Sequence, residues 1–370
     1  MPDRLLVVLF YAHPVGHAIE ALHYANGHAA ADPALEVSVA LNAATPVELA
    51  RFVPSVRAAY PIDHPFVEPG DGSADALAGI PRGWTWIADD ARRHQPVQLE
   101  LFAGMRDLYA ASDAYFTAER RRGVAGFPPL PYRPHQPLRL ALPEHLRPDV
   151  GRPALALMPA GSSERALYPS VGSWRLVLDA LAEALPGLRV VLVGKRAADE
   201  RTATSLAERE HRELLAHPAV AVDAFDRPLP EQLALVEACD VFVAPHTGFG
   251  LAALAVGTPW LALSGGRWFE YWFNHVPFRS VLPDTERYPS FSQFAAPDVA
   301  PDEDGPRTPS MTARRIREDL PRIVAAAEEL VARRVPYERC LADYFRDLVA
   351  AHGGDPSAIW SIDGVHRGYV

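Results

Sequence analysis

The sequence predicts an α/β protein built from two doubly wound domains. Its 370 residues exceed what one hydrophobic core usually organises. Short apolar runs alternate with amphipathic segments, which is the pattern of a parallel sheet whose strands are joined by helices. A proline-rich stretch, residues 126–153, interrupts the alternation and is expected to be a linker. We therefore expect a first domain over residues 1–150, a second over 151–335 and a helical tail over 336–370.

The first domain is expected to begin with a buried strand, Leu5–Phe10, followed by a loop that contains His13 and His17. An amphipathic helix should follow at about residues 18–30. The other elements expected here are a strand at 35–41, a helix from 46 to 52, loop from 60 to 83, a helix at 99–111 and a short strand at 114–117.

The second domain shows a cleaner alternation of strand and helix. We expect strands at 154–158, 189–193, 219–222, 241–244 and 260–263, with helices at 173–185, up to 215, at 230–238 and at 251–256. A long charged helix, 312–351, should follow, and this helical tail, or its last part through Trp360, is expected to pack back on the first domain.

Composition narrows the classes of partner. The formal net charge of -10 argues against broad attraction to nucleic acid or an anionic membrane. The two cysteines, Cys239 and Cys340, lie outside any metal-ligand spacing. Because no apolar run approaches about 20 residues and the N-terminus resembles a first strand, we expect a cytoplasmic enzyme without a transmembrane segment. Richness in Ala, Arg and Pro is typical of a high-GC bacterial genome.

The most informative segment runs from Asp240 to Gly266, where a buried strand leads through a glycine-bearing turn into a helix. Free amides and the positive end of the helix dipole at such a turn favour a diphosphate. Gly248 and Gly250 would let the backbone approach it, and Thr247 would add a hydroxyl. Two glycines also occur in ordinary tight turns, so the motif alone is weak evidence.

Two other strands of this domain end in loops suited to the same ligand. The first strand runs into a small-residue loop with Gly161 and Ser162, and the second ends in Gly-Lys-Arg, with Lys195 or Arg196 available to offset phosphate charge. Ligands bind beyond the carboxyl ends of parallel strands, so the three loops are expected to converge on one nucleotide. Surface solvation is the alternative role of both basic residues.

The order and spacing of these features resemble the donor-binding half of the bacterial heptosyltransferase-like GT-B glycosyltransferases. The resemblance covers about residues 153–265 and is carried by Thr247-Gly248, Leu251-Ala252-Ala253 and Gly257-Thr258-Pro259. It implies two Rossmann-like domains facing each other across a cleft, the GT-B fold, with a nucleotide diphosphate sugar held mainly by the C-terminal one.

This sequence departs from the family pattern at three places. Pro245-His246 stands where the family usually has Asn-Asp, Phe249-Gly250 replaces a histidine after the glycine, and Leu167-Tyr168-Pro169 stands for a Lys-x-Trp-Pro segment. Our candidates for binding the donor are the small, polar and basic residues of the three loops, together with residues of the last turn that differ from the family pattern. They are Gly161, Ser162, Lys195, Arg196, His246, Thr247, Gly248, Phe249 and Gly250.

The reaction is expected to invert the sugar's configuration. The glutamates that retaining GT-B enzymes set around this turn are missing. Inversion needs a general base to deprotonate the acceptor hydroxyl, and histidine suits that task at neutral pH. His17, which follows Gly16, is the first candidate, His13 the second, and Glu20 is expected to orient or replace either. The alternative is that these histidines only cap and solvate the first helix.

A densely aromatic segment, residues 265–275, follows the last expected strand of the second domain. Within it Arg267 is a candidate for phosphate and Glu270 for a sugar hydroxyl, while a helix that packs the two domains together is the alternative. We expect neither cofactor nor metal.

The function expected is transfer of a sugar from a nucleotide diphosphate sugar to a small-molecule or glycan hydroxyl. Two alternatives remain open: a nucleotide-sugar epimerase of the same fold, which needs carboxylates around the donor sugar, and a non-catalytic subunit of GT-B type.

Overall fold

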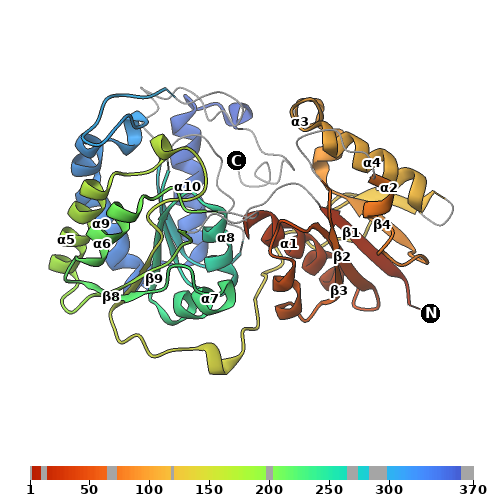
Figure 1. Cartoon of the computed structure of the whole chain (residues 1–370), viewed down its shortest axis with the longest axis horizontal. Helices are drawn as coiled ribbons and strands as arrows, with labels where there is room; N and C mark the ends of the chain where they lie inside the picture. Colours follow the sequence, from red (N-terminus) through yellow and green to blue (C-terminus); the bar gives the residue numbers. More distant parts are fainter. Residues whose placement is uncertain are drawn as a thin grey trace. The chain divides into compact units, whose positions relative to one another are not determined.

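The computed structural model describes residues 2–9, 15–64, 73–117, 121–196, 203–264, 274–282 and 298–359. The chain divides into two units, Met1–Ala141 and Leu142–Val370. Figure 1 shows that each unit is built around its own sheet.

Unit 1 contains a five-stranded parallel sheet in the spatial order β3-β2-β1-β4-β5. In such a sheet β1 lies next to β4, so the strand order reverses between these two strands. Apolar side chains fill the central strands because both faces of a parallel sheet are covered. The strands are β1 (Arg4–Leu9), β2 (Glu36–Asn42), β3 (Val56–Ile62), β4 (Trp86–Asp89) and β5 (Arg121–Val124).

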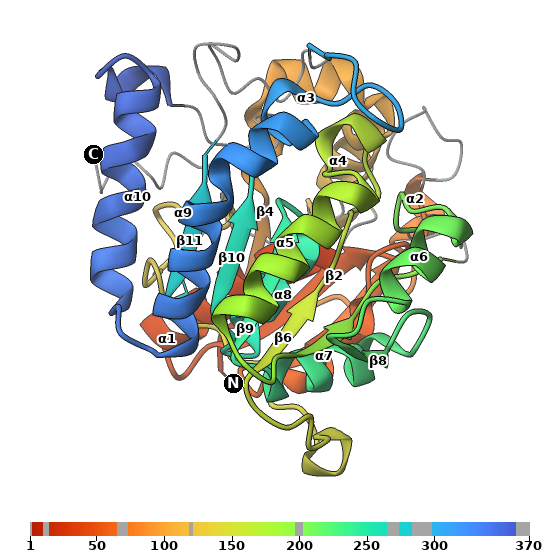
Figure 2. The same ribbon diagram turned by 90° about the vertical axis from the view of Figure 1, so that its left-hand side faces the viewer.

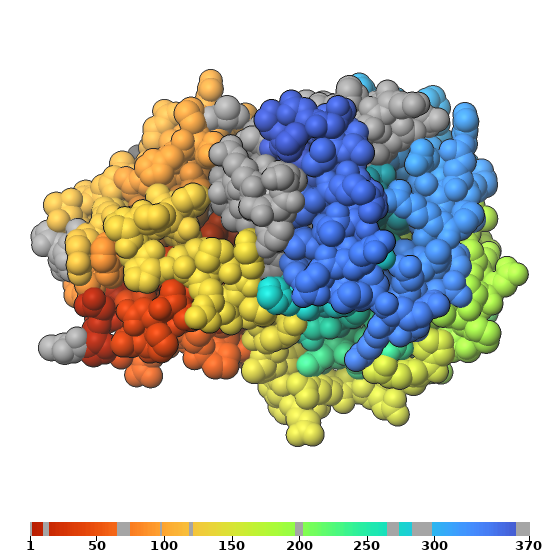
Figure 3. All heavy atoms as spheres, turned by 180° about the vertical axis from the view of Figure 1, so that it is seen from behind, coloured from red at the N-terminus to blue at the C-terminus, as the bar shows by residue number. Residues whose placement is uncertain are grey.

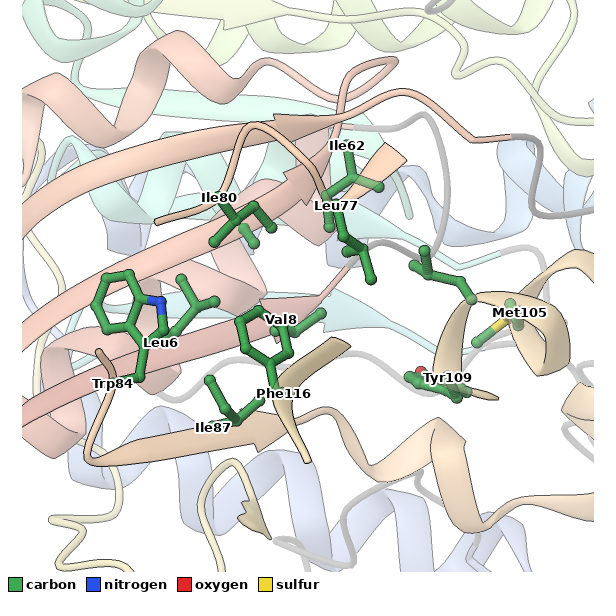
Figure 4. Packing of buried hydrophobic residues seen from close by; sticks show 12 residues of the cluster. Leu6, Val8, Ile62, Leu77, Ile80, Trp84, Ile87, Met105, Tyr109 and Phe116 are labelled. Carbon is green, nitrogen blue, oxygen red and sulfur yellow. The ribbon is translucent and has the colours of Figure 1, made fainter. Parts of the chain in front are cut away.

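One buried cluster of unit 1 joins the sheet to a long helix (Figure 4). Leu6 and Val8 of β1 pack with Trp84, Met105 and Phe116, all at most 1% exposed. The α-helices of this unit are α1 (Val15–Ala31), α2 (Ser73–Ala76), α3 (Pro96–Leu101) and α4 (Ala103–Phe116), with 3-10 turns η1 (Val47–Phe52) and η2 (Ala91–His94).

Unit 2 contains a six-stranded parallel sheet in the order β11-β10-β9-β6-β7-β8. Counted from its own first strand this is the order 6-5-4-1-2-3, the doubly wound Rossmann topology, and it reverses between β6 and β9. The strands are β6 (Ala154–Leu157), β7 (Arg189–Leu192), β8 (Val220–Asp223), β9 (Val241–Pro245), β10 (Trp260–Leu263) and β11 (Phe278–Val281).

Helices cover both faces of this second sheet. Figure 2 shows α5 and α9 in front of the strands and α7 and α8 behind them. The helices are α5 (Val171–Ala184), α6 (Glu208–Leu215), α7 (Leu229–Ala238), α8 (Gly248–Ala255), α9 (Ala313–Val331) and α10 (Tyr337–Ala351). The short 3-10 turns are η3 (Glu144–Leu146), η4 (Arg165–Leu167), η5 (Pro309–Met311) and η6 (Pro356–Ala358).

The expected single tail helix, 312–351, is two helices. A break at residues 332–336 separates α9 from α10, because Arg333 has a positive φ of 51° and Pro336 cannot continue a helix. Both helices pack near β11, and Figure 3 shows them side by side on the surface of unit 2. Residues 360–370 lie outside the described residues, so the return of the tail to the first domain stays a prediction.

Three further expectations for unit 1 are wrong. Residues 114–117 belong largely to α4 and not to a strand, and β3 and β4 occupy stretches expected to be loop or left unassigned. Helix α1 begins at Val15, so His17 lies in its first turn and not in the preceding loop. Strands β3 and β4 form because their pairing with β2 and β1 outweighs weak local patterns.

Candidate functional site

The strand order of each unit indicates where a ligand should bind. In open parallel sheets ligands lie beyond the carboxyl ends of the strands at the point where the order reverses. That point lies between β6 and β9 in unit 2 and between β1 and β4 in unit 1.

In unit 2 the loops that follow β6 and β9 are in contact. A Cβ placed on Gly161, after β6, would lie 3.0 Å from Thr247 Cγ2, after β9, and 2.8 Å from the Tyr168 hydroxyl. Gly161 is therefore needed for this close approach, and the expected convergence of the β6 and β9 loops is present. Ser162 beside it is exposed.

Hydrogen bonds fix the shape of the β6 loop. The Tyr168 hydroxyl accepts from the Ser163 amide at 2.9 Å, and the buried Trp174 indole donates to the Pro159 carbonyl at 2.8 Å. Tyr168 therefore holds the β6 loop in place through this hydrogen bond. A loop held in this way is ordered before any ligand arrives.

The loop after β7 is tied to the same place through residues 204 and 205. The Ser205 amide donates to the Gly161 carbonyl at 2.8 Å, and its hydroxyl donates to the Ser163 carbonyl at 2.6 Å. The Lys195 amide donates to the Thr204 hydroxyl at 2.9 Å. The backbone at Lys195 is thus linked through 204 and 205 to the β6 loop.

The two basic candidates of this loop differ in their surroundings. Arg196 is exposed and forms an ion pair with Asp226 at 2.9 Å, supported by a bond from its amide to the same carboxylate. Lys195 is half-buried. An arginine engaged with a carboxylate is a weaker candidate for phosphate, so Lys195 is the better one.

The turn after β9 places Thr247 at the N-cap of α8. Its side chain makes no capping hydrogen bond, which leaves the hydroxyl able to turn elsewhere; the nearest partner is the Met158 sulfur at 3.9 Å. Gly248 and Phe249 are the first helical residues, and their amides point along the helix axis as the first donors of α8. This arrangement is suited to an anion.

Two neighbouring residues of α8 face the core of unit 2. The ring of Phe249 packs 5.6 Å from that of Phe242 and is 6% exposed. A Cβ on Gly250 would lie between 2.1 and 2.3 Å from ring atoms of the buried Trp260, and the Gly250 amide already donates to the Thr247 carbonyl at 3.0 Å. The glycine at position 250 is explained by helix-to-strand packing, without any ligand.

His246 follows β9 directly, and burial lowers its pKa from 6.5 to about 4. The imidazole is therefore neutral at physiological pH. It can offer a hydrogen bond to a ligand but no positive charge.

In unit 1 the corresponding place joins β4 to α1. Glu20 of α1 accepts two bonds from Arg92, at 3.2 Å and 2.9 Å, so both of its oxygens are engaged. His17 lies one helical turn before Glu20 and is half-buried. Both residues that the sequence analysis proposed for catalysis on α1 thus lie at the reversal point.

Asp90 was not foreseen. It follows β4, is fully buried, and accepts bonds from the Arg92 amide at 2.7 Å and the Tyr109 hydroxyl at 2.8 Å. Burial is the largest of the influences on its pKa and raises it from 3.8 to about 6. The sequence signal was the run Asp89-Asp90 followed by Arg92, which would have drawn notice had β4 been recognised.

Three predicted site residues lie outside the described residues: His13, Arg267 and Glu270. Their roles stay predictions. Among the residues that the structure does describe, no group of three or more His, Cys, Asp or Glu side chains is arranged to hold a metal ion. The same described ranges contain no helix with the length and apolarity needed to cross a membrane.

Comparison with solved structures shows the fold. The crystal structure of the glycosyl transferase family 9 from Veillonella parvula matches with a TM-score of 0.57 and 11% identity, over 90% of this chain and 98% of the other. The E. coli heptosyltransferase WaaC with ADP-2-deoxy-2-fluoro heptose matches with a TM-score of 0.53 and 13% identity, over 86% and 99%. No family model and no curated protein matches the sequence.

The chain therefore has the α/β fold of these glycosyltransferases, with one Rossmann-like sheet in each unit. The predicted GT-B fold and the resemblance to the heptosyltransferase-like group are confirmed at the level of the fold. At 11% and 13% identity the matches carry no residue roles, so substrate and mechanism are argued from the site.

Proposed function

We propose that the protein is a glycosyltransferase that moves a sugar from a nucleotide diphosphate sugar to an acceptor hydroxyl with inversion. The observation that carries this proposal is the contact between Gly161 and Thr247 at the reversal point of unit 2. It brings a small-residue loop and a helix N-terminus together, which is what a diphosphate needs.

In this proposal the diphosphate lies against the start of α8. The Gly248 and Phe249 amides and the Thr247 hydroxyl would donate to phosphate oxygens, with Ser162 and Lys195 on the facing loops. His246 would add a neutral hydrogen bond. Arg196, Arg267 and Glu270 remain further candidates for the donor.

The base would come from unit 1. His17 is the first candidate, because a neutral imidazole accepts a proton readily at neutral pH, whereas Glu20 has both oxygens bonded to Arg92. The acceptor hydroxyl attacks the anomeric carbon, the bond to the diphosphate breaks, and the hydroxyl proton passes to the imidazole. His13 remains the second candidate.

The fold and the site together support the proposed donor class. WaaC is described with an ADP-heptose analogue, and we extend only the class, a nucleotide diphosphate sugar, to this chain. The cytoplasmic location and bacterial origin expected from the sequence belong to the same proposal.

The test is a product assay with purified protein. Nucleotide sugars are supplied with and without a panel of glycan and small-molecule acceptors, and released nucleoside diphosphate and sugar products are measured. Release of diphosphate with a glycosylated product supports transfer. A new sugar isomer without acceptor would indicate an epimerase, and binding without any turnover would indicate a non-catalytic subunit.

His17→Ala is the informative variant in that assay. Loss of a general base typically costs about 10²- to 10⁴-fold in rate, while contacts to the donor in the other unit are kept. Turnover should therefore fall far more than nucleotide affinity. A parallel loss of affinity would instead mark His17 as a donor contact, and unchanged turnover would move the base to another residue.

A further inference from the structure

Unit 2 contains a cavity on the flank of its sheet, at strand β11. Its volume is about 250 Å³, which is larger than the roughly 150 Å³ in which an apolar cavity holds benzene. The described residues that line it belong to the segment 278–282, which contains β11, and to α9 and α10; Figure 2 shows these elements side by side. The loops after β6, β7 and β9 contribute none of these lining residues, so the cavity is separate from the candidate donor site.

Ion pairs join the elements that surround the cavity. Arg279 of β11 reaches Glu329 of α9 at 2.8 Å and Asp343 of α10 at 3.0 Å. Asp343 is also paired with Arg346, at 2.7 Å. These charges neutralise one another at close range, so they shape the cavity but leave little charge for a ligand.

Arg322 of α9 is engaged more weakly. Its guanidinium lies 3.9 Å from the carboxylate of Asp347, which Arg346 holds more closely, at 2.9 Å. Among the ion pairs that the structure defines between described residues of the cavity wall, the Arg322 pair is the longest. The guanidinium has five N–H donors and makes one bond at 3.3 Å, to the backbone carbonyl of Ser280. Arg322 therefore retains donors for an anion.

The side chain of Ser280 provides a further donor at the same place. Ser280 lies on β11 in the cavity wall, and its hydroxyl is buried without a hydrogen-bond partner in the described part of the chain. Because a buried hydroxyl without a partner is costly, such groups normally bind a ligand or an ordered water. The guanidinium of Arg322 and the Ser280 hydroxyl thus meet at one residue of the wall.

The rest of the wall is mainly apolar. Val281, Ala326 and Tyr344 line the cavity and are 6%, 8% and 5% exposed. Cys340 also lines it, but burial, the largest influence on its thiol, raises the pKa of that group. The thiol is therefore protonated and a poor nucleophile, so the cavity is suited to binding and not to covalent chemistry.

We propose that this cavity binds a small monocarboxylic acid, with its carboxylate on Arg322 and the Ser280 hydroxyl and its apolar ring or chain against Ala326. A planar carboxylate matches the fork of a guanidinium. A cationic ligand is disfavoured, because Glu329, Asp343 and Asp347 each have an arginine within 3.0 Å. The inference does not depend on the proposed transfer reaction.

The test is a titration of benzoate into the full-length chain, followed by saturation-transfer NMR of the benzoate ring protons. We expect a Kd on the order of 0.1–1 mM, with the neutral isostere benzamide binding at least about tenfold more weakly. Arg322→Gln should weaken benzoate binding about tenfold or more. Arg317→Gln is the matched control, because Arg317 lies on the same helix, is 53% exposed and pairs with Glu303 at 2.9 Å outside the cavity. It should bind benzoate as the wild type does.

Three further variants locate the site. Ala325→Phe adds a ring at the exposed edge of the wall and should abolish binding with Arg322 intact. Ser280→Ala should weaken benzoate binding a few-fold without lowering the stability of the free protein, because the hydroxyl has no protein partner to lose. Thr247→Val, altered in the candidate donor site, should keep the wild-type affinity for benzoate.

The proposal is overturned if wild-type protein gives no saturation transfer to benzoate, which would leave water as the partner of Ser280. Equal affinity for benzoate and benzamide, or unchanged benzoate affinity in Arg322→Gln, would also contradict it. Loss of binding in Thr247→Val but not in Arg322→Gln would place the carboxylate at the donor loops instead. Failure to detect sugar transfer with any donor would leave this proposal intact, because its measurement uses neither donor nor acceptor.

Discussion

Gly250→Ala should destabilise unit 2 without removing a ligand contact. The new Cβ would lie 2.1 Å from the nearest ring atom of Trp260, whereas ordinary contact begins at 3.4 Å, so the ring or α8 must move by about 1.3 Å (3.4 minus 2.1). Overpacking of this kind lowers the free energy of unfolding by about 3 kcal/mol, and the better helix propensity of alanine offsets about 1 kcal/mol of this loss. The net loss is about 2 kcal/mol, or roughly 4–8 °C in Tm for a unit of this size.

Thermal and urea unfolding measure this loss, and Gly172→Ala is the matched control in the same unit. A Cβ there meets the flexible, exposed carboxylate of Glu303 at 3.1 Å and the Ser170 hydroxyl at 3.7 Å, an ordinary contact. In a Trp260→Phe background the methyl group added at position 250 should cost much less, because the clashing ring atoms are gone. Wild-type stability for Gly250→Ala, or an equal loss in both backgrounds, would refute the packing role. Lower nucleotide affinity with unchanged stability would return Gly250 to the donor site.

Three other predictions concern charge and hydrogen bonding. Because the pKa of Asp90 is raised to about 6, the native state keeps a proton that the unfolded chain has lost between pH 4 and 6, so this group's contribution to stability falls as pH rises. Relative to wild type, the free energy of unfolding of Asp90→Asn should therefore increase by at most about 3 kcal/mol from pH 4 to pH 7, as measured by urea unfolding. Ser205→Ala loses the 2.6 Å bond to the Ser163 carbonyl and should cost about 1 kcal/mol, with a few-fold weaker nucleotide binding by calorimetry; full affinity would show that this bond does not shape the loop. Arg279 forms ion pairs with Glu329 at 2.8 Å and with Asp343 at 3.0 Å. Arg279→Met removes both and should lower the free energy of unfolding by about 1–3 kcal/mol, with a smaller loss at high salt. A loss that does not depend on salt would contradict an electrostatic origin.

The sequence predicted unit 2 more fully than unit 1, for a physical reason. The strands β6, β7, β9 and β10 are apolar runs with clear loops and helices between them, so periodicity located them within a residue or two. In unit 1, β4 has only four residues and is stabilised by pairing with β1, a contact between positions about 80 residues apart. The pattern of apolar residues within a short stretch cannot reveal a pairing partner so far away in the sequence.

The sequence likewise predicted some parts of the candidate site and missed others. Loops that follow recognisable strands, such as those with Gly161, Lys195 and Thr247, were found because strand ends can be read from the chain. The partners of Glu20 and of Gly250 were not found. Arg92 lies 72 residues from Glu20, and Trp260 meets Gly250 only once α8 has folded onto the sheet.

The most direct test of the donor site is a calorimetric titration of ADP, UDP, GDP, CDP and dTDP into the wild-type protein and into Thr247→Val. One diphosphate should bind the wild type, and Thr247→Val should bind it about tenfold more weakly, the loss of one hydrogen bond to a charged group. Thr258→Val is the matched control, since the Thr258 hydroxyl donates to the Val236 carbonyl at the far end of α8. It should lose stability and keep its affinity. Equal affinity in wild type and Thr247→Val, or no binding of any of the five diphosphates, would contradict a donor site at the β6 and β9 loops.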